Sequence, residues 1–324
     1  MNIAVLGSGS FGLAIALMLN ENNNKITMWT KYEEEKNLLI NHKGNPKLLP
    51  GVVMPDSITY TTNMEECVRD SDIIFIMVPA GFVDDVSNEL GKYYKGQYIC
   101  VGSKGIEQDS CRFVVDVIKD RIKTKKIAVI SGPSFAIDLA SYVPIGLTLA
   151  CKHKKTALII KKAIANKYLK IRLSDDVVGA EICGSIKNII AIACGIVEGM
   201  GLPESTKAML ITESMHDIKE LIHALGGNKK TIMSYAGIGD LILTCTSSKS
   251  RNFTYGRLIG SKASLSIINE YQNNTTIEGL YTLRSIYKLL KNKKVKMPII
   301  DIMYSIIIKG ENVDLIPSFL IGKK

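Results

Sequence analysis

The first half of the chain alternates short apolar runs with segments of helical periodicity. Continuous apolar runs of roughly four to eight residues are typical of parallel strands buried on both faces of a sheet. Helical segments such as residues 82–94 and 110–122 lie between these runs. The alternation predicts a doubly wound α/β sheet. The predicted strands cover residues 2–7, 25–30, 72–79, 97–103, 126–131, 144–151 and 168–174.

The second half carries helical spacing almost throughout. After about residue 176 no further strand-like run follows, and glycine turns near residues 199, 226 and 237 separate the helical segments. A chain of 324 residues can bury more than one core. We therefore predict two domains, a sheet domain of residues 1–178 and an all-helical domain of residues 179–324, with a ligand cleft between them.

Composition argues against several classes of protein. The formal charge is +10, but the basic residues are dispersed apart from short runs at 152–155 and 291–294, and only 6% of residues are aromatic. We therefore expect no nucleic-acid partner. The cysteines are odd in number without a CxxC motif and the histidines form no metal-like pair, so we expect neither disulfides nor a metal site. Because no apolar run reaches the ~18 residues of a membrane helix and no signal peptide is visible, we expect a cytoplasmic protein without stable membrane insertion.

A glycine motif follows the first predicted strand. The segment GSGSFG places Gly7, Gly9 and Gly12 in a GxGxxG pattern that opens a helix. The first glycine permits a tight turn, the second lets the backbone approach a pyrophosphate, and the third allows close packing of helix and strand. The helix N-terminus adds amide donors and the positive end of its dipole. This order of strand, motif and helix predicts a Rossmann-type, dinucleotide-binding first domain.

Later strand ends carry further candidate ligand contacts. Open α/β sheets bind ligands beyond the carboxyl ends of their strands. Lys31 follows the second strand, where an acid usually binds the ribose of NAD, so it either holds the 2′-phosphate of NADP or is only a solvated charge. Lys104 suits an anionic substrate or a cofactor phosphate, and the turn with Gly132, Ser134 and Ala136 exposes backbone amides. The alternative for both segments is ordinary turn chemistry.

One lysine lies in an unusually apolar helical segment. Lys187, in GSIKNIIAIACGIVEG, is the only charged residue between positions 181 and 198. A buried ammonium is unfavourable unless it is paired or loses its proton. The side chain therefore either extends its charged end to water or has a function. The small or polar neighbours Gly184, Ser185 and Asn188 favour a polar cleft and hence a function.

Polar residues also interrupt the apolar pattern further along the helical half. Asp240 follows a glycine turn inside an apolar stretch, where it is either a helix N-cap or the partner of Lys187. The cluster of Ser250, Arg251 and Asn252 precedes a helix, and an arginine with adjacent donors suits a phosphate. Glu278 opens another helix, where the helix dipole alone also favours an acid.

Together these segments resemble one family, the bacterial-type NAD(P)-dependent glycerol-3-phosphate dehydrogenases. The resemblance covers nearly the whole chain, in the order and rough spacing of that family. It rests on GSGSFG, LLPGVVMPDSI, SDIIFIMVP, SKGIE, SGPSFA, GSIKNIIAIACGI, GIGDLILTCTSSKSRN and IEG. It implies a soluble, commonly homodimeric enzyme that reduces dihydroxyacetone phosphate to sn-glycerol 3-phosphate, a precursor of phospholipid backbones, with NAD(H) or NADP(H).

The resemblance also implies roles for individual residues. Lys187 matches the family's proton acceptor in the oxidising direction, and we expect Asp240 to orient it while burial lowers the pKa of the lysine. The implied cofactor contacts are Gly7, Gly9, Ser10, Phe11, Gly12, Lys31, Lys104, Ala136, Arg251, Thr276 and Glu278. The implied substrate contacts are Lys104, Gly132, Ser134, Lys187, Asn188, Asp240, Thr244, Ser250, Arg251 and Asn252.

Three positions depart from the family pattern. Ala80-Gly81 replace Ser followed by His or Gln, Glu213-Ser214 replace an Arg-Gly pair, and Lys31 falls where the family varies, which leaves the nucleotide preference open.

Other interpretations are a β-hydroxyacid dehydrogenase, a nucleotide sensor without catalysis and a basic nucleic-acid-binding protein. The cluster at residues 250–252 argues against the first, since an unphosphorylated acid needs no second anion site. A sensor needs neither that site nor the pairing of Lys187 with Asp240. Dispersed charge would give the third only weak, salt-dependent binding to polyanions.

Overall fold

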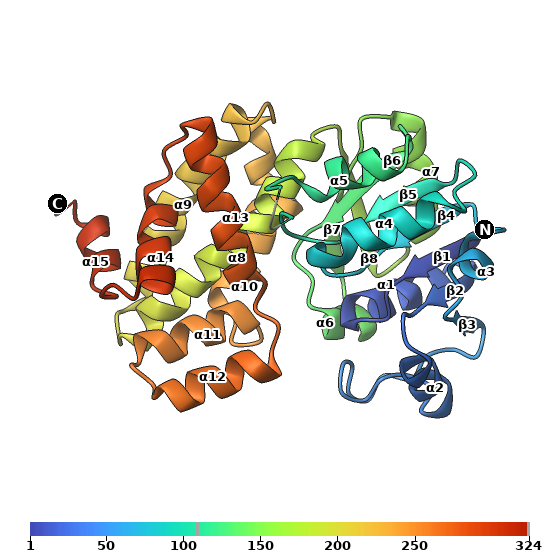
Figure 1. Ribbon diagram of the computed structural model, residues 1–324, viewed down its shortest axis with the longest axis horizontal. Coiled ribbons are helices and arrows are strands. Elements are labelled where there is room, and N and C mark those ends of the chain that lie inside the picture. Colours follow the sequence, from blue (N-terminus) through green and yellow to red (C-terminus); the bar gives the residue numbers. More distant parts are fainter. Residues whose placement is uncertain (108–109, 323–324) are drawn as a thin grey trace. The chain divides into compact units, whose positions relative to one another are not determined.

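The chain folds into two compact units (Figure 1). The computed structural model describes residues 1–107 and 110–322. The sheet unit consists of Met1–Lys104 and Val114–Val177, and the helical unit consists of Gly105–Phe113 and Val178–Lys324. The sequence predicts two uninterrupted domains that meet at residues 178/179. In the structure the short segment Gly105–Phe113 belongs to the helical unit as well.

The sheet unit is built on one eight-stranded sheet. Its strands are β1 (Asn2–Leu6), β2 (Lys25–Trp29), β3 (Ile58–Thr61), β4 (Ile73–Ile76), β5 (Tyr98–Val101), β6 (Ile127–Ser131), β7 (Ile145–Ala150) and β8 (Leu169–Ser174). They lie in the order β3-β2-β1-β4-β5-β6-β7-β8 and pair in parallel, except that β7 is antiparallel to β6. The chain reverses its direction across the sheet between β1 and β4, where open α/β sheets bind ligands.

The apolar runs locate every strand except β3. This strand has only four residues, two of them threonines, and it forms the edge of the sheet by pairing with β2 alone. A short edge strand needs no continuous apolar run, because its burial is partial. The observed architecture otherwise confirms the predicted fold class, a Rossmann-type doubly wound sheet followed by a helical domain.

Helical segments join the strands of the sheet unit. They are α1 (Ser10–Asn20), α2 (Glu33–Asn41), α3 (Met64–Val68), η1 (Ala80–Phe82), α4 (Val83–Gly91), α5 (Val114–Arg121), α6 (Ala136–Ala140) and α7 (Lys154–Ile164). Helix α1 is apolar nearly all round, and all its residues from 12 to 19 are buried. It packs in one hydrophobic cluster with side chains of β1, β2 and β4, so the glycine turn that precedes α1 is held by the core.

The helical unit is organised around a long buried helix. Its elements are α8 (Val177–Gly199), α9 (Glu204–Ala224), η2 (Lys229–Met233), η3 (Tyr235–Gly239), α10 (Asp240–Thr246), α11 (Arg251–Gly260), α12 (Leu265–Asn274), α13 (Glu278–Lys293), α14 (Pro298–Lys309) and α15 (Leu315–Leu320). Every residue from 179 to 197 in α8 is buried. By length and composition α8 is one described helix that could cross a membrane, which the apolar runs did not indicate. Its most apolar window is entirely buried, as in the core helix of a globular protein.

Helices α8 and α11 contact each other through glycines. A Cβ added to Gly195 of α8 would lie 2.0 Å from the Phe253 carbonyl oxygen, and one added to Gly256 of α11 would lie 2.0 Å from the Ile192 carbonyl oxygen. The same conflict arises one turn further along each helix, at Gly199 and at Gly260. The two helices therefore approach backbone to backbone, which only glycine permits. This contact sets the distance between the Lys187 segment on α8 and the start of α11.

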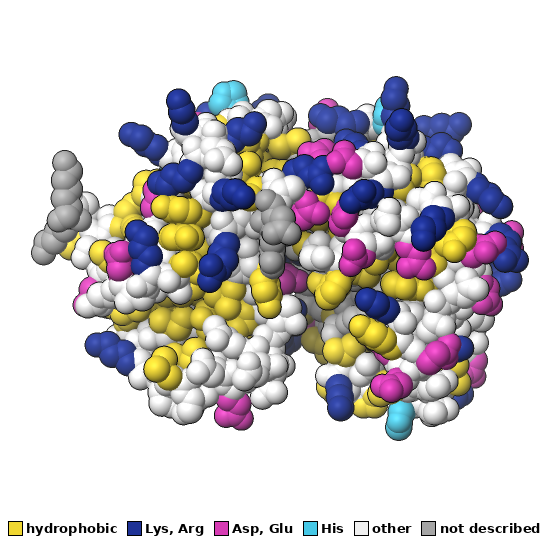
Figure 2. Space-filling model, viewed as in Figure 1, with side chains coloured by type: hydrophobic (Ala, Val, Ile, Leu, Met, Phe, Trp, Pro, Cys, Tyr) yellow, Lys and Arg dark blue, Asp and Glu magenta, His cyan; other side chains and the backbone are white. Residues whose placement is uncertain are grey.

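Basic side chains are spread over the surface. Figure 2 shows Lys and Arg side chains distributed over the viewed face, with acidic side chains between them, and not gathered into one basic patch. The distribution agrees with the dispersed charges in the sequence.

Candidate active site

The glycine motif forms an open turn between β1 and α1. Gly7 has φ +110°, and an added Cβ there would lie 2.9 Å from Val78 Cγ1. A Cβ on Gly12 would lie 2.1 Å from the Gly7 carbonyl oxygen, whereas one on Gly9 would meet nothing within 4 Å. The turn is therefore crowded on the protein side and open at Gly9, where the backbone can approach a ligand. Ser10 and Phe11 begin α1 beside this opening, so these residues fit a dinucleotide pyrophosphate.

The other predicted contacts in the sheet unit follow parallel strands at the same edge. Lys31 is exposed two residues after β2, and Gly132 follows β6 directly with φ +156°. Lys104 follows β5, and its Nζ lies 5.9 Å from the centre of the Phe11 ring, which connects this lysine to the glycine turn. The turn after β6 carries the remaining contacts. Ser134 Oγ donates to the Gly132 carbonyl oxygen over 3.2 Å, and Ala136 begins α6. The sheet therefore gathers these residues at the carboxyl ends of β1, β2, β5 and β6.

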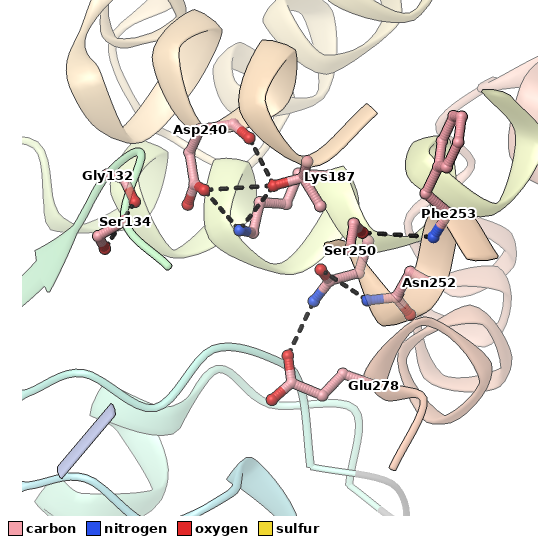
Figure 3. Close-up of polar contacts among 10 residues, drawn as sticks. Gly132, Ser134, Lys187, Asp240, Ser250, Asn252, Phe253 and Glu278 are labelled. Atoms are coloured by element: carbon pink, nitrogen blue, oxygen red, sulfur yellow. Dashed lines mark hydrogen bonds and ion pairs between the residues drawn. The ribbon is translucent and has the colours of Figure 1, made fainter. Parts of the chain in front are cut away.

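A buried ion pair joins α8 to α10 in the helical unit (Figure 3). Lys187 Nζ lies 2.5 Å from Asp240 Oδ1 and donates to Thr244 Oγ1 over 3.0 Å. The Asp240 side chain is 1% exposed and that of Lys187 is 10% exposed. The Thr244 hydroxyl in turn donates to the Asp240 carbonyl oxygen over 2.6 Å. The charged end of Lys187 is therefore held by partners inside the unit and does not extend along the helix surface to water.

A backbone kink places Asp240 opposite Lys187. The preceding segment η3 contains Gly237 with a non-helical ψ of −107°, and a Cβ there would lie 2.2 Å from the Ile232 carbonyl oxygen. The Ser234 hydroxyl accepts from Gly237 N over 3.2 Å and stabilises this turn. Asp240 is the first residue of α10, whose N-cap is Gly239. The alternative of a simple N-cap aspartate therefore does not hold, because the carboxylate binds Lys187.

A second polar group joins α8, α11 and α13. The Asn188 amide donates to Glu278 Oε2 over 3.0 Å, and the Asn252 amide donates to Asn188 Oδ1 over 3.0 Å. The Gly279 backbone N–H donates to Asn252 Oδ1 over 2.9 Å. We call these residues, Asn188, Asn252, Glu278 and Gly279, the amide ring. Figure 3 shows the Asn252 and Glu278 side chains of this group.

The predicted phosphate cluster lies at the start of α11. Ser250 is the N-cap of this helix, and its hydroxyl accepts from Phe253 N over 3.3 Å. Arg251 is exposed at the first helical position, while Asn252 is buried in the amide ring. Thr276 is exposed two residues before α13. The helical unit thus brings together two polar groups, one of Lys187, Asp240 and Thr244 and one of Asn188 with Asn252 and Glu278 at the starts of α11 and α13.

Some residues of this region were not indicated by the sequence. The Gly279 N–H completes the amide ring, but a glycine after Glu278 carries no recognisable signal for such a role. The spacing of Gly195 with Gly199 and of Gly256 with Gly260 was visible as two GxxxG patterns and could have suggested a helix contact. Cys245, which follows Thr244, is buried, and burial raises the pKa of its thiol well above the usual value. Burial therefore disfavours its thiolate form.

The comparisons with known proteins match both units. Residues 2–157 match the model of the NAD-dependent glycerol-3-phosphate dehydrogenase N-terminus, and residues 176–318 match that of the C-terminus. A Thermoanaerobacter protein named glycerol-3-phosphate dehydrogenase (NAD(P)+) is 37% identical over 96% of this chain and 94% of its own length. A Fusobacterium nucleatum protein of the same name is 34% identical over the same shares. The crystal structure of the glycerol-3-phosphate dehydrogenase from Coxiella burnetii superposes with a TM-score of 0.93 at 28% identity, covering 99% of this chain and 98% of that one.

Proposed function

The chain belongs to the NAD-dependent glycerol-3-phosphate dehydrogenase family, and on this premise we propose that Lys187 is the acid/base of its reaction. As a glycerol-3-phosphate dehydrogenase it is an NAD(P)-dependent oxidoreductase. We propose that in the cell it reduces dihydroxyacetone phosphate to sn-glycerol 3-phosphate for glycerophospholipid synthesis. The observation that carries the role of Lys187 is its buried ion pair with Asp240.

The proton chemistry requires a donor at the ketone oxygen. When bound, the nicotinamide cofactor supplies the hydride for C2 of the ketone, and negative charge then develops on the ketone oxygen. The Lys187 ammonium stabilises that charge and donates its proton to the oxygen, which becomes the hydroxyl of the product. Asp240 and Thr244 fix the direction of Nζ, and the Asp240 carboxylate stabilises the charged form of the lysine. In the reverse direction neutral Lys187 accepts the hydroxyl proton.

The start of α11 suits the substrate phosphate. Ser250, Arg251 and Asn252 place a hydroxyl, a guanidinium and an amide at the N-terminus of a ten-residue helix. Charge-assisted bonds from arginine and the helix dipole both favour a phosphate there. Binding of the phosphate would orient the ketone without entering the proton chemistry. Lys104, Gly132 and Ser134 would contribute substrate contacts from the sheet unit.

The glycine turn suits the cofactor. Gly7, Gly9, Ser10, Phe11 and Gly12 would hold the pyrophosphate. Lys31, Lys104, Ala136, Arg251, Thr276 and Glu278 would contact other parts of the nucleotide. We also propose that the enzyme is a cytoplasmic homodimer without nucleic-acid or membrane-embedded partners, which its likeness to the family supports. Sedimentation equilibrium that gave a monomer at micromolar concentration would contradict the dimer.

The acid/base role is tested by comparing two buried lysines. Lys187→Gln keeps a donor for Asp240 but cannot transfer a proton, so we expect turnover to fall by about a thousandfold or more. Lys207→Gln is the matched control, because Lys207 is 4% exposed and its ammonium pairs with Glu198 and Glu204 and not with Asp240, although its Nζ also lies 5.6 Å from the centre of the Phe253 ring. It should lose stability but keep turnover per folded molecule. Oxidation of the reduced cofactor with dihydroxyacetone phosphate measures both, and near-normal turnover of Lys187→Gln would refute the role.

A further inference from the structure

The amide ring has a fixed direction. The hydrogen bonds of the ring start at the Gly279 backbone N–H and end at Glu278 Oε2. A backbone N–H can only donate, and a carboxylate oxygen can only accept. The orientation of the Asn252 and Asn188 amides between them follows. Because Glu278 and Gly279 are consecutive residues, the ring begins and ends on the first turn of α13.

Burial prevents water from replacing a member of the ring. Asn188 is 3% exposed and Asn252 is 7% exposed. A Cβ on Gly279 would lie 2.9 Å from both Asn252 Oδ1 and the Asn188 carbonyl oxygen, so the closeness of the three helices depends on this glycine. If the Asn188 amide were rotated by 180°, its NH₂ group would face the NH₂ group of Asn252, and its oxygen would face the Glu278 carboxylate. A buried donor or acceptor left without a partner is strongly unfavourable, so the ring is stable in one orientation.

The direction of the ring decides what Asn252 offers a ligand. Its amide nitrogen carries two hydrogens, and the ring uses one of them for Asn188. The second hydrogen is on the same nitrogen, so the group available to an anion at the start of α11 is a donor. If the amide were turned over, its carbonyl oxygen would take that place and repel a phosphate.

We propose that Asn188 is a positioning residue that couples the cofactor site to the substrate-phosphate site. Through Asn188, the Glu278 carboxylate holds the Asn252 amide in the orientation that donates to the phosphate. This inference rests on the proposed function, in which Glu278 contacts the cofactor and Asn252 the substrate phosphate. A cofactor donor on Glu278 Oε1 leaves Oε2 for Asn188, so a bound cofactor and an intact ring are compatible. A cofactor that fixes the Glu278 carboxylate in this orientation stabilises the ring, and by linkage each ligand then favours binding of the other.

The test is a rescue experiment at residues 188 and 278. Asn188→Asp removes the donor to Glu278 and places two carboxylates together. We expect the substrate KM at saturating cofactor to rise about tenfold or more, with a smaller change in kcat. Adding Glu278→Gln restores a donor, because the Gln amide donates to the carboxylate introduced at position 188, and the net charge of the pair returns to that of the wild type. The substrate KM should then return to within about threefold of wild type, while the cofactor KM stays that of Glu278→Gln alone.

The result that overturns the proposal is a double variant whose substrate KM stays as high as that of Asn188→Asp. If Asn188→Asp does not fold, as its melting curve would show, Glu278→Ala replaces it. Loss of the acceptor should then raise the substrate KM about fivefold even at saturating cofactor, and an unchanged KM would overturn the coupling. All these variants retain Lys187. A failure of the ring therefore leaves Lys187→Gln inactive, whereas a failure of the acid/base role leaves it active.

Discussion

The carboxyl group of Asp217 on α9 is partly buried, which destabilises its charged form. The pKa of this carboxyl group is raised to about 6, because burial and, to a smaller extent, nearby Glu213 outweigh a bond from the Ile299 backbone N–H and nearby His216, which lower it. Within the described part of the chain no group bonds to its buried Oδ2 atom. The carboxylate is therefore less stable in the folded protein than in the unfolded chain.

The sign of the pH dependence follows from this raised pKa. Below the unfolded value of 3.8 the group is protonated in both states and costs nothing. As the pH rises towards 6, the unfolded chain releases its proton first, so stability falls and the full penalty is reached above pH 6. A shift of about two units corresponds to about 3 kcal/mol, and partial exposure of the carboxyl group reduces this to about 1–2 kcal/mol.

We therefore predict that Asp217→Asn stabilises the protein at pH 8 by about 1–2 kcal/mol, with the gain falling to about a third of that at pH 4.5. Asparagine can still accept from Ile299 N but carries no charge. Urea unfolding at both pH values measures the difference, with Asp116→Asn on the exposed face of α5 as the control. The control should change stability by less than about 0.5 kcal/mol at either pH. Destabilisation by Asp217→Asn at pH 8, or a gain of equal size at both values, would refute the reasoning.

Two further predictions concern the helix contact and the nucleotide. Gly256→Ala places a Cβ 2.0 Å from the Ile192 carbonyl oxygen, so urea unfolding should show a loss of about 3 kcal/mol or more, whereas Gly81→Ala, whose added Cβ meets nothing within 4 Å, should be neutral. Equal effects of the two substitutions would contradict the contact. Lys31→Ala should raise the KM for NADPH about tenfold and leave that for NADH nearly unchanged, because only NADPH carries the 2′-phosphate that Lys31 would bind. Initial rates with both cofactors decide this, and unchanged KM values for both would show that Lys31 is only a solvated charge.

The sequence predicts those features that a local pattern or an isolated charge reveals. The buried parallel strands are continuous apolar runs, and the glycine turn has a spacing that only close backbone contacts explain. Lys187 and Asp240 were detectable because each is a lone charge in an apolar stretch. They are 53 positions apart, but two buried opposite charges each need a partner.

The amide ring was not predictable, because its asparagines carry no charge that would require a partner. Asn188 and Asn252 are neutral and common residues, and nothing in their local sequence requires a distant partner. Their contact depends on how three helices pack, and hence on the glycines of α8 and α11. The edge strand β3 was missed because its burial, and so its apolar pattern, is incomplete. Local signals thus locate elements and charges, whereas contacts among neutral groups depend on tertiary geometry.

The glycine contact between α8 and α11 also has a consequence for motion. Side chains between two helices normally form a deformable layer, since their rotamers can change as the helices slide. Here carbonyl oxygens of each helix lie directly against glycines of the other, that of Ile192 in α8 against Gly256 and that of Phe253 in α11 against Gly195, with no side chain between them. Sliding would separate all these contacts at once, so the two helices move as a single stiff body. We therefore expect Lys187 and Asn252 to keep their separation during turnover, and any closure that accompanies catalysis to bend the chain outside these two helices.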